Sequence, residues 1–237
     1  MPLLDEIRDG VQDILDSRLN VREARVIPHT EDITLLDEGV EFEGTVMFSD
    51  LAESTTLGTD LERRTAAKVF KAFLYSCTKI ITGQGGRLTS FEGDRVMGVF
   101  MGDTKNSDAV TSALRINYVV HEVLSPLLHS HFLSLRQAGF QIQQGTGIDT
   151  GRILVVRAGQ RNANDLVWVS KATGFADRLS GIREDPYRTF ISADVFNVMR
   201  DSVKSTGQPP VSMWEQRSYL WRGEDRTIYR SHYYWRF

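Results

Sequence analysis

Two aspartates stand at the ends of expected strands. Asp50 follows the apolar run 44–47, and Asp94 follows a glycine in "FEGDRVM". A helical pattern separates them, and the strands that flank such a helix are often neighbours in one sheet. Adjacent carboxylates repel each other unless a cation lies between them. Because hard oxygen ligands favour Mg²⁺ or Mn²⁺, the pair predicts a site for two divalent metal ions.

Each aspartate, taken alone, is also explained by a purely structural role. Asp50 precedes Glu53, Ser54 and Thr55, and Asp, Ser and Thr commonly cap a helix that follows a strand. Gly–Asp is likewise a common pair in turns. The hypothesis of a metal site therefore depends on the two positions together.

Composition narrows the class of protein. The 237 residues carry a net charge of −3, with 41% apolar and 25% charged residues, which is typical of a soluble globular protein. No excess of positive charge favours nucleic acid as a partner. No apolar run is long enough for a membrane helix, and the acidic start does not resemble a signal peptide. The single cysteine, Cys77, lies on an apolar helical face, which predicts a buried thiol in a cytoplasmic protein.

The spacing of apolar residues predicts an α+β fold, with one mostly antiparallel sheet and helices packed on one of its faces. Residues 1–40 are expected to form an amphipathic helix over 2–19 and a polar, irregular connector. Residues 41–237 are expected to form the main domain. Its expected helices cover 60–84, 106–128, 171–182 and 192–200. Its expected strands cover 41–49 and 164–170, with strand pairs over 86–102, 140–159 and 213–237, and the 140–159 pair is expected to turn at Asp149–Thr150–Gly151.

Four segments in order resemble the class III nucleotidyl cyclases, over about residues 41–230. "TVMFSDLAEST" and "GGRLTSFEGDRVMGVF" are similar to the two metal motifs of that family. "GTGIDTGRILV" is similar to its glycine-containing hairpin, and "DLVWVSKATGFADRL" to the helix with its transition-state residues. The resemblance implies the class III sandwich with a ferredoxin-like core, with residues 41–237 as the catalytic domain.

The resemblance also implies roles for matching positions. Asp50, Asp94 and the carbonyl of Leu51 would bind two divalent metal ions, Mn²⁺ or Mg²⁺, and Arg178 would stabilise the transition state. In homodimeric members this arginine comes from the other subunit, so a homodimer is expected. Phe48 and the short polar residues Glu53, Ser54 and Thr55 would lie at the nucleoside triphosphate, where backbone N–H groups bind the phosphates.

The chain departs from the family at the base pocket. Ser90 stands where adenylate cyclases have lysine and guanylate cyclases have glutamate, and Val167 stands where adenylate cyclases have aspartate or threonine. Glu92 shares a strand face with Ser90, so it is expected to reach the pocket. Gly174 replaces the asparagine that orients the ribose, and Arg222 lies where cyclases often have a basic phosphate contact.

These departures fit the stand-alone bacterial pyrimidine cyclases of the Pycsar anti-phage system. That resemblance implies a cytoplasmic enzyme that converts UTP to cyclic UMP, with a downstream effector that it does not contact directly. CTP as substrate, an adenylate cyclase with an altered pocket, and an inert nucleotide-binding domain are the alternatives. Gly174 favours the inert domain, and the presence of both metal aspartates opposes it.

Overall fold

The computed structural model describes residues 2–52 and 62–237, which form two compact units. The smaller unit comprises Met1–Glu43 and Arg152–Lys171, and the larger comprises Gly44–Gly151 and Ala172–Phe237. Two long strands, β2 (Glu38–Leu51) and β5 (Gln144–Gln160), run from one unit into the other.

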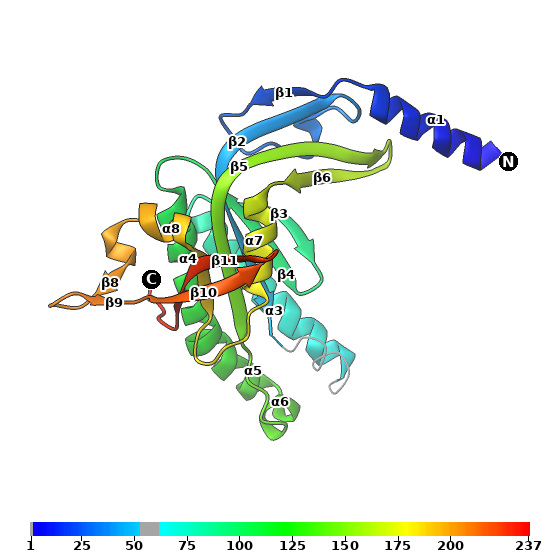
Figure 1. Ribbon diagram of the computed structural model, residues 1–237. Helices are drawn as coiled ribbons and strands as arrows, with labels where there is room; N and C mark the ends of the chain where they lie inside the picture. Colours follow the sequence, from blue (N-terminus) through cyan, green and yellow to red (C-terminus); the bar gives the residue numbers. More distant parts are fainter. Residues whose placement is uncertain (1, 53–61) are drawn as a thin grey trace. The chain divides into compact units, whose positions relative to one another are not determined.

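The smaller unit begins with the expected amphipathic helix, α1 (Pro2–Asp16), which ends before Leu19. The apolar side chains of α1 are all exposed. In the same unit β6 (Ala163–Val169) pairs antiparallel with the end of β5, from Leu154 opposite Val169 to Gln160 opposite Ala163 (Figure 1).

The segment expected to be an irregular connector contains a strand, β1 (Asn20–Glu23), and the short 3-10 helix η1 (Thr30–Asp32). β1 pairs in parallel with the start of β2, and Arg22 forms an ion pair with Glu38 at 2.7 Å. All four residues of β1 are exposed. The strand therefore carries no apolar alternation, which is why the sequence pattern did not reveal it.

The larger unit is built on a mostly antiparallel sheet, as expected. The strand order is β10-β11-β7-β5-β2-β4-β3, and the pairing of β5 with β7 is parallel (Figure 1). The strands not yet placed are β3 (Arg87–Glu92), β4 (Arg95–Phe100), β7 (Thr189–Ser192), β10 (Glu215–Trp221) and β11 (Glu224–Ser231). A separate pair is formed by β8 (Ser205–Thr206) and β9 (Val211–Ser212).

The helices of the larger unit lie on both faces of the sheet, so the expectation of a single covered face was wrong. Consecutive residues of a strand point to opposite faces. Ile191 of β7 joins the large core beneath α3 and α4, whereas Phe190 packs with Phe175 and Leu179 of α7. The helical segments are α3 (Arg63–Gly83), α4 (Lys105–Val119), the π-helix η2 (Val120–Leu124), α5 (Ser125–His131), α6 (Leu133–Gln137), α7 (Lys171–Ser180), α8 (Ala193–Val198) and the 3-10 helix η3 (Asp201–Val203).

The expected turn at Asp149–Thr150–Gly151 was wrong, because β5 continues through these residues as one strand. The pairing of Ile148 with Ile191 and the bonds of the Thr150 hydroxyl to β2 hold the segment extended. The hairpin of this region lies further on, between β5 and β6. Pairing partners far away in the sequence thus override a local turn signal.

The expectation of a buried thiol is confirmed. Cys77 is a fully buried residue of α3, and burial raises the pKa of its thiol to about 12. Among residues 2–52 and 62–237, no helix has the length and apolarity needed to cross a membrane.

Candidate active site

The two aspartates lie at neighbouring strand ends of the larger unit. β2 pairs antiparallel with β4, and Asp50 is directly opposite Arg95, the residue that follows Asp94. Burial raises the pKa of the Asp50 carboxyl, the charge of Asp94 raises it further, and Arg183 opposes both effects. The expectation that the strand–helix–strand unit brings Asp50 and Asp94 near each other agrees with this register.

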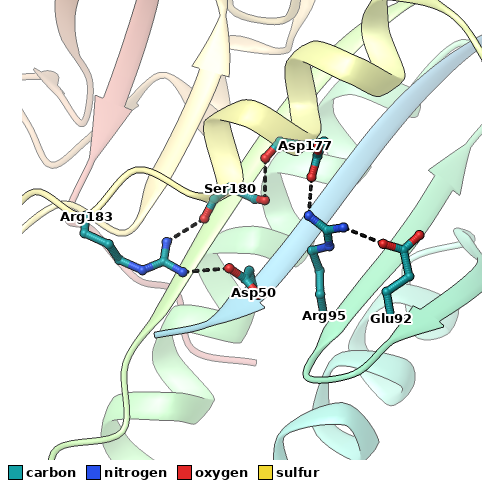
Figure 2. Close-up of polar contacts among 6 residues, drawn as sticks. All are labelled: Asp50, Glu92, Arg95, Asp177, Ser180 and Arg183. Carbon is teal, nitrogen blue, oxygen red and sulfur yellow. Dashed lines mark hydrogen bonds and ion pairs between the residues drawn. The ribbon is translucent and has the colours of Figure 1, made fainter. Parts of the chain in front are cut away.

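An arginine that sequence reasoning missed binds Asp50. The Nη2 atom of Arg183 lies 2.7 Å from Oδ2 of Asp50 (Figure 2). Its Nη1 atom donates to the carbonyl oxygens of Ser180 at 2.6 Å and Ile182 at 3.1 Å. Arg183 follows α7 in the chain, so only the fold brings it to the end of β2.

Two glycines of β5 explain how the end of α7 can lie so close to the sheet. A Cβ atom at Gly147 would overlap the carbonyl oxygen of Ala176 and the backbone nitrogen of Ser180. A Cβ atom at Gly145 would overlap the carbonyl oxygen of Ser180 and the guanidinium of Arg183. The first two glycines of "GTGIDTG", Gly145 and Gly147, therefore serve close helix–strand packing, and they do not form a turn.

A second arginine organises the side chains around Phe48. Arg95 donates hydrogen bonds to Glu92 at the end of β3 and to Asp177 in α7 (Figure 2). Its guanidinium carbon lies 5.2 Å from the centre of the Phe48 ring, within the range of a cation–π contact. No residue spacing in the sequence signals this network, because its four members come from four separate elements, β2, β3, β4 and α7.

The expected base-pocket residues Ser90 and Glu92 share one face of β3. Ser90 is opposite Met97 and Glu92 is opposite Arg95, with regular alternation between them. Glu92 is exposed and its carboxylate is bound by Arg95. Val167 belongs to the smaller unit, where it is opposite Val156 in the β5–β6 hairpin and is exposed.

The residues expected at the ribose and phosphates lie on α7 and in the turn between β10 and β11. The Arg178 side chain is exposed and forms no ion pair with any residue that the structure describes. Gly174 has room for a side chain, since an added Cβ atom would meet only Trp221, at 4.0 Å. Arg222 adopts a left-handed conformation with φ of 52°, and its guanidinium lies 4.9 Å from the Trp221 ring. Glu53, Ser54 and Thr55 lie outside the described residues.

Few side chains at this site could bind a metal ion. Within residues 2–52 and 62–237, no group of three or more His, Cys, Asp or Glu side chains converges as a metal site would require. Asp50 and Asp94 nevertheless offer hard oxygen donors, and Leu51, which follows Asp50 in the chain, has a backbone carbonyl. A cation bound here would complete its coordination with water or substrate oxygens, as Mg²⁺ usually does.

No protein-family model matches the chain, but curated proteins match it over its full length. A uridylate cyclase from Rhodovulum sp. is 38% identical over 236 residues, which cover 100% of this chain and 98% of that protein. A uridylate cyclase from Xanthomonas perforans is 33% identical over 238 residues, which cover 100% of this chain and 99% of that protein.

Solved structures of class III cyclases share the fold. A guanylyl cyclase has a TM-score of 0.68 at 18% identity, with 83% of this chain and 94% of that chain covered. An adenylyl cyclase from P. aeruginosa has a TM-score of 0.65 at 22% identity, with 82% and 95% covered. Because the two relatives match from end to end at 33% identity or more, the chain belongs to the uridylate cyclase family, and its fold is that of the class III nucleotidyl cyclases.

Proposed function

We propose that this chain is a metal-dependent uridylate cyclase, which converts UTP to 3′,5′-cyclic UMP and pyrophosphate. The observation that carries the proposal is the full-length similarity to the Rhodovulum protein of that name. In the reaction the ribose 3′-oxygen forms a bond to the α-phosphorus. The bond from that phosphorus to the β-phosphate oxygen breaks, so pyrophosphate leaves and the 3′-hydroxyl loses its proton.

Asp50, Asp94 and the Leu51 carbonyl are proposed to hold two divalent metal ions, Mn²⁺ or Mg²⁺. Such ions, when bound, acidify the 3′-hydroxyl and neutralise charge on the triphosphate. The raised pKa of Asp50, caused by burial and by the nearby Asp94, supports the fit, because a second carboxylate beside a partly buried one favours a bound cation. Glu53, Ser54 and Thr55 follow Asp50 and are proposed to bring backbone N–H groups to the phosphates.

The base is proposed to lie beside Phe48, Ser90 and Glu92 of the larger unit, and Val167 is proposed as a base contact from its position in the sequence alone. Neither Ser90 nor Val167 can form the pair of hydrogen bonds that a lysine and an aspartate form with adenine. A serine hydroxyl both donates and accepts, so Ser90 suits O4 or N3–H of uracil. Gly174 and Arg222 complete the proposed substrate contacts at the ribose and the phosphates.

Arg178 is proposed to act in the active site of the other subunit of a homodimer. Its side chain is exposed and unpaired among the described residues, whereas its neighbour Asp177 binds Arg95 in its own sheet. A fixed guanidinium stabilises the charge that develops on the phosphorane oxygens. A monomer would lack this group, so cyclase activity is proposed to need the dimer.

The test is an assay of the purified protein with UTP, CTP, ATP and GTP in the presence of Mn²⁺, with the cyclic products separated by chromatography. Cyclic UMP as the main product supports the proposal. Cyclic CMP or cyclic AMP as the main product would show that the substrate is CTP or ATP and not UTP, and the chain would still be a nucleotide cyclase. No cyclic product from any of the four would favour an inert nucleotide-binding domain.

The product is proposed to act in the cytoplasm as a second messenger in anti-phage defence. The basis is the resemblance to stand-alone pyrimidine cyclases with a separate effector. Infection of cells that carry the gene with or without a neighbouring effector gene tests this role, with cyclic UMP measured after phage addition. A level of cyclic UMP that stays constant through infection would contradict it.

A further inference from the structure

The carboxylate of Asp50 already has a cationic partner in this chain. Arg183 donates from Nη2 to Oδ2 of Asp50 at 2.7 Å and from Nη1 to the Ser180 carbonyl (Figure 2). The Ile182 carbonyl also accepts from Nη1. The fork of the guanidinium therefore spans the end of α7 and the end of β2. Such a bond between two charged groups is stronger than a neutral hydrogen bond.

The fold makes room for this contact. In β5, Gly145 lies where any Cβ atom would overlap the Arg183 guanidinium. Gly145 is not in the left-handed region of backbone conformations, so its own backbone does not require glycine. A side chain is excluded at this position because the Arg183 guanidinium and the Ser180 carbonyl oxygen occupy the space that it would need.

The charges around Asp50 show which cation would be displaced by a metal ion. Arg95 is shared between Glu92 and Asp177, so its charge is already matched by two carboxylates. Arg183 is the arginine bound to Asp50, and it faces a pair of carboxylates, Asp50 and Asp94, whose charges interact. One guanidinium does not neutralise that pair.

We propose that Arg183 is the resident counter-cation of Asp50 and competes with divalent metal ions, so that the two-metal site is complete only after Arg183 releases Oδ2. The inference rests on the proposed metal-dependent function. Asp50 has two carboxylate oxygens, and Arg183 occupies one of them. The side chain of Arg183 is 38% exposed, so water can solvate the guanidinium when it leaves, and this solvation offsets part of the cost of breaking the ion pair. Arg183 thus acts on metal binding through Asp50.

The test measures Mn²⁺ binding to the full-length protein without nucleotide, by electron paramagnetic resonance of free Mn²⁺. Arg183→Gln removes the competing charge and is expected to bind Mn²⁺ about threefold to fivefold more tightly, the scale of a partly exposed ion pair. Arg188→Gln is the matched control. It removes the same charge from a side chain that binds Asp185 and the Tyr187 carbonyl and does not contact Asp50.

Equal or weaker Mn²⁺ binding by Arg183→Gln than by Arg188→Gln would overturn the inference and leave the proposed function intact. The variant Asp94→Asn distinguishes a failure of the inference from a failure of the proposed function. If Asp94→Asn binds Mn²⁺ as tightly as the wild type, the metal assignment itself fails, and the inference fails with it.

A second measurement uses the wild-type protein and does not depend on the folding of a variant. Phenylglyoxal labels accessible arginines, and mass spectrometry reports the labelling of each peptide. Mn²⁺ is expected to increase labelling of Arg183 and to leave Arg188 unchanged. If Mn²⁺ leaves Arg183 labelling unchanged or lowers it, Arg183 remains on Asp50 as a fixed support and does not compete with metal.

Discussion

Asp177 accepts a hydrogen bond from Arg95, and this ion pair joins α7 to the first residue of β4. Arg95 directly follows Asp94, and Asp177 directly precedes Arg178. One contact therefore links the strand that begins directly after a proposed metal ligand to the helix that carries the proposed transition-state arginine. The link holds α7, and with it Arg178, in a fixed orientation relative to the sheet.

Asp177→Asn is expected to lower kcat/KM for UTP about tenfold, since misplaced catalytic groups lose rate even when they remain present. Its effect on the free energy of unfolding should stay below about 1 kcal/mol, because the side chains of Arg95 and Asp177 are 28% and 45% exposed and solvent screens the pair. Steady-state kinetics and urea unfolding measure the two effects. Asp201→Asn, which removes an exposed pair with Lys204, is the control and should change neither. A large loss of stability with unchanged kcat/KM would contradict this role for Asp177.

A buried carboxyl in the middle of β5 makes stability depend on pH. Burial raises the pKa of Asp149 to about 6 from an ordinary value of 3.8, although bonds from Ser192 and the Thr150 N–H oppose the shift. The folded state therefore holds this proton more tightly than the unfolded state. The resulting stabilisation is complete below pH 3.8 and is lost as the pH rises to about 6 and above.

Asp149→Asn should remove this pH dependence. The contribution of Asp149 amounts to at most about 3 kcal/mol, from a shift of about two pKa units. Urea unfolding at several values of pH between 4 and 8 measures it as the difference in slope between wild type and variant. Asp201→Asn should retain the wild-type slope. Equal slopes for Asp149→Asn and the wild type would show that Asp149 does not titrate in this range.

The elements that could be predicted from the sequence are those with a strong local pattern. The apolar spacing around Phe73 and the glycine at 83 predicted α3, and the Gly93–Asp94 turn predicted the β3–β4 pair. β1 was missed because its four residues are exposed and are held by backbone bonds to β2. The turn at Asp149–Thr150–Gly151 was wrong because β5 has partners on both sides.

The residues of the candidate site also differ in whether the sequence could predict them. Asp50 and Asp94 could be predicted because each ends a recognisable strand. Arg183 and Arg95 could not, because their significance depends on which carboxylates the fold places beside them. Arg183 lies 133 residues from Asp50 in the sequence, and Arg95 lies 82 residues from Asp177. No spacing rule covers contacts of that range.

Asp50→Ala and Asp94→Ala should each reduce cyclic UMP formation by about 10³-fold or more, the scale seen when a group that stabilises transition-state charge is removed. Both residues lie at strand ends outside the hydrophobic core, so the variants should remain folded. Product chromatography measures the activity, and circular dichroism checks the fold. Wild-type turnover by either folded variant would remove that residue from the proposed metal site.

Mixing two inactive variants tests whether the active site is shared between subunits. Asp50→Ala lacks a metal ligand, and Arg178→Ala lacks the arginine. In a mixed homodimer one of the two sites then has an intact Asp50 and an intact Arg178, so cyclase activity should return to a quarter to a half of the wild-type rate, depending on the fraction of mixed dimers (about a half if pairing is random). Native mass spectrometry confirms subunit exchange. If the subunits exchange and no activity returns, each site takes both residues from one chain.

The base preference is tested by restoring the residues that adenylate cyclases carry. Wild-type protein should use UTP in preference to CTP, and either of these in preference to ATP and GTP. Discrimination based on hydrogen bonds can reach about 10⁴-fold when the wrong base leaves buried polar groups unpaired. Ser90→Lys with Val167→Asp should therefore lower kcat/KM for UTP first. It need not produce efficient turnover of ATP, because a purine also needs space that a pocket for a smaller ring does not provide.

Ser90→Ala with Val167→Ala is the matched control, since it removes the same side chains without adding a charge, and it should lose less activity with UTP. The measurement is kcat/KM for all four nucleotides at a fixed concentration of Mn²⁺, and a wild-type preference for ATP or GTP would contradict the assignment of Ser90 and Val167 to a pyrimidine pocket.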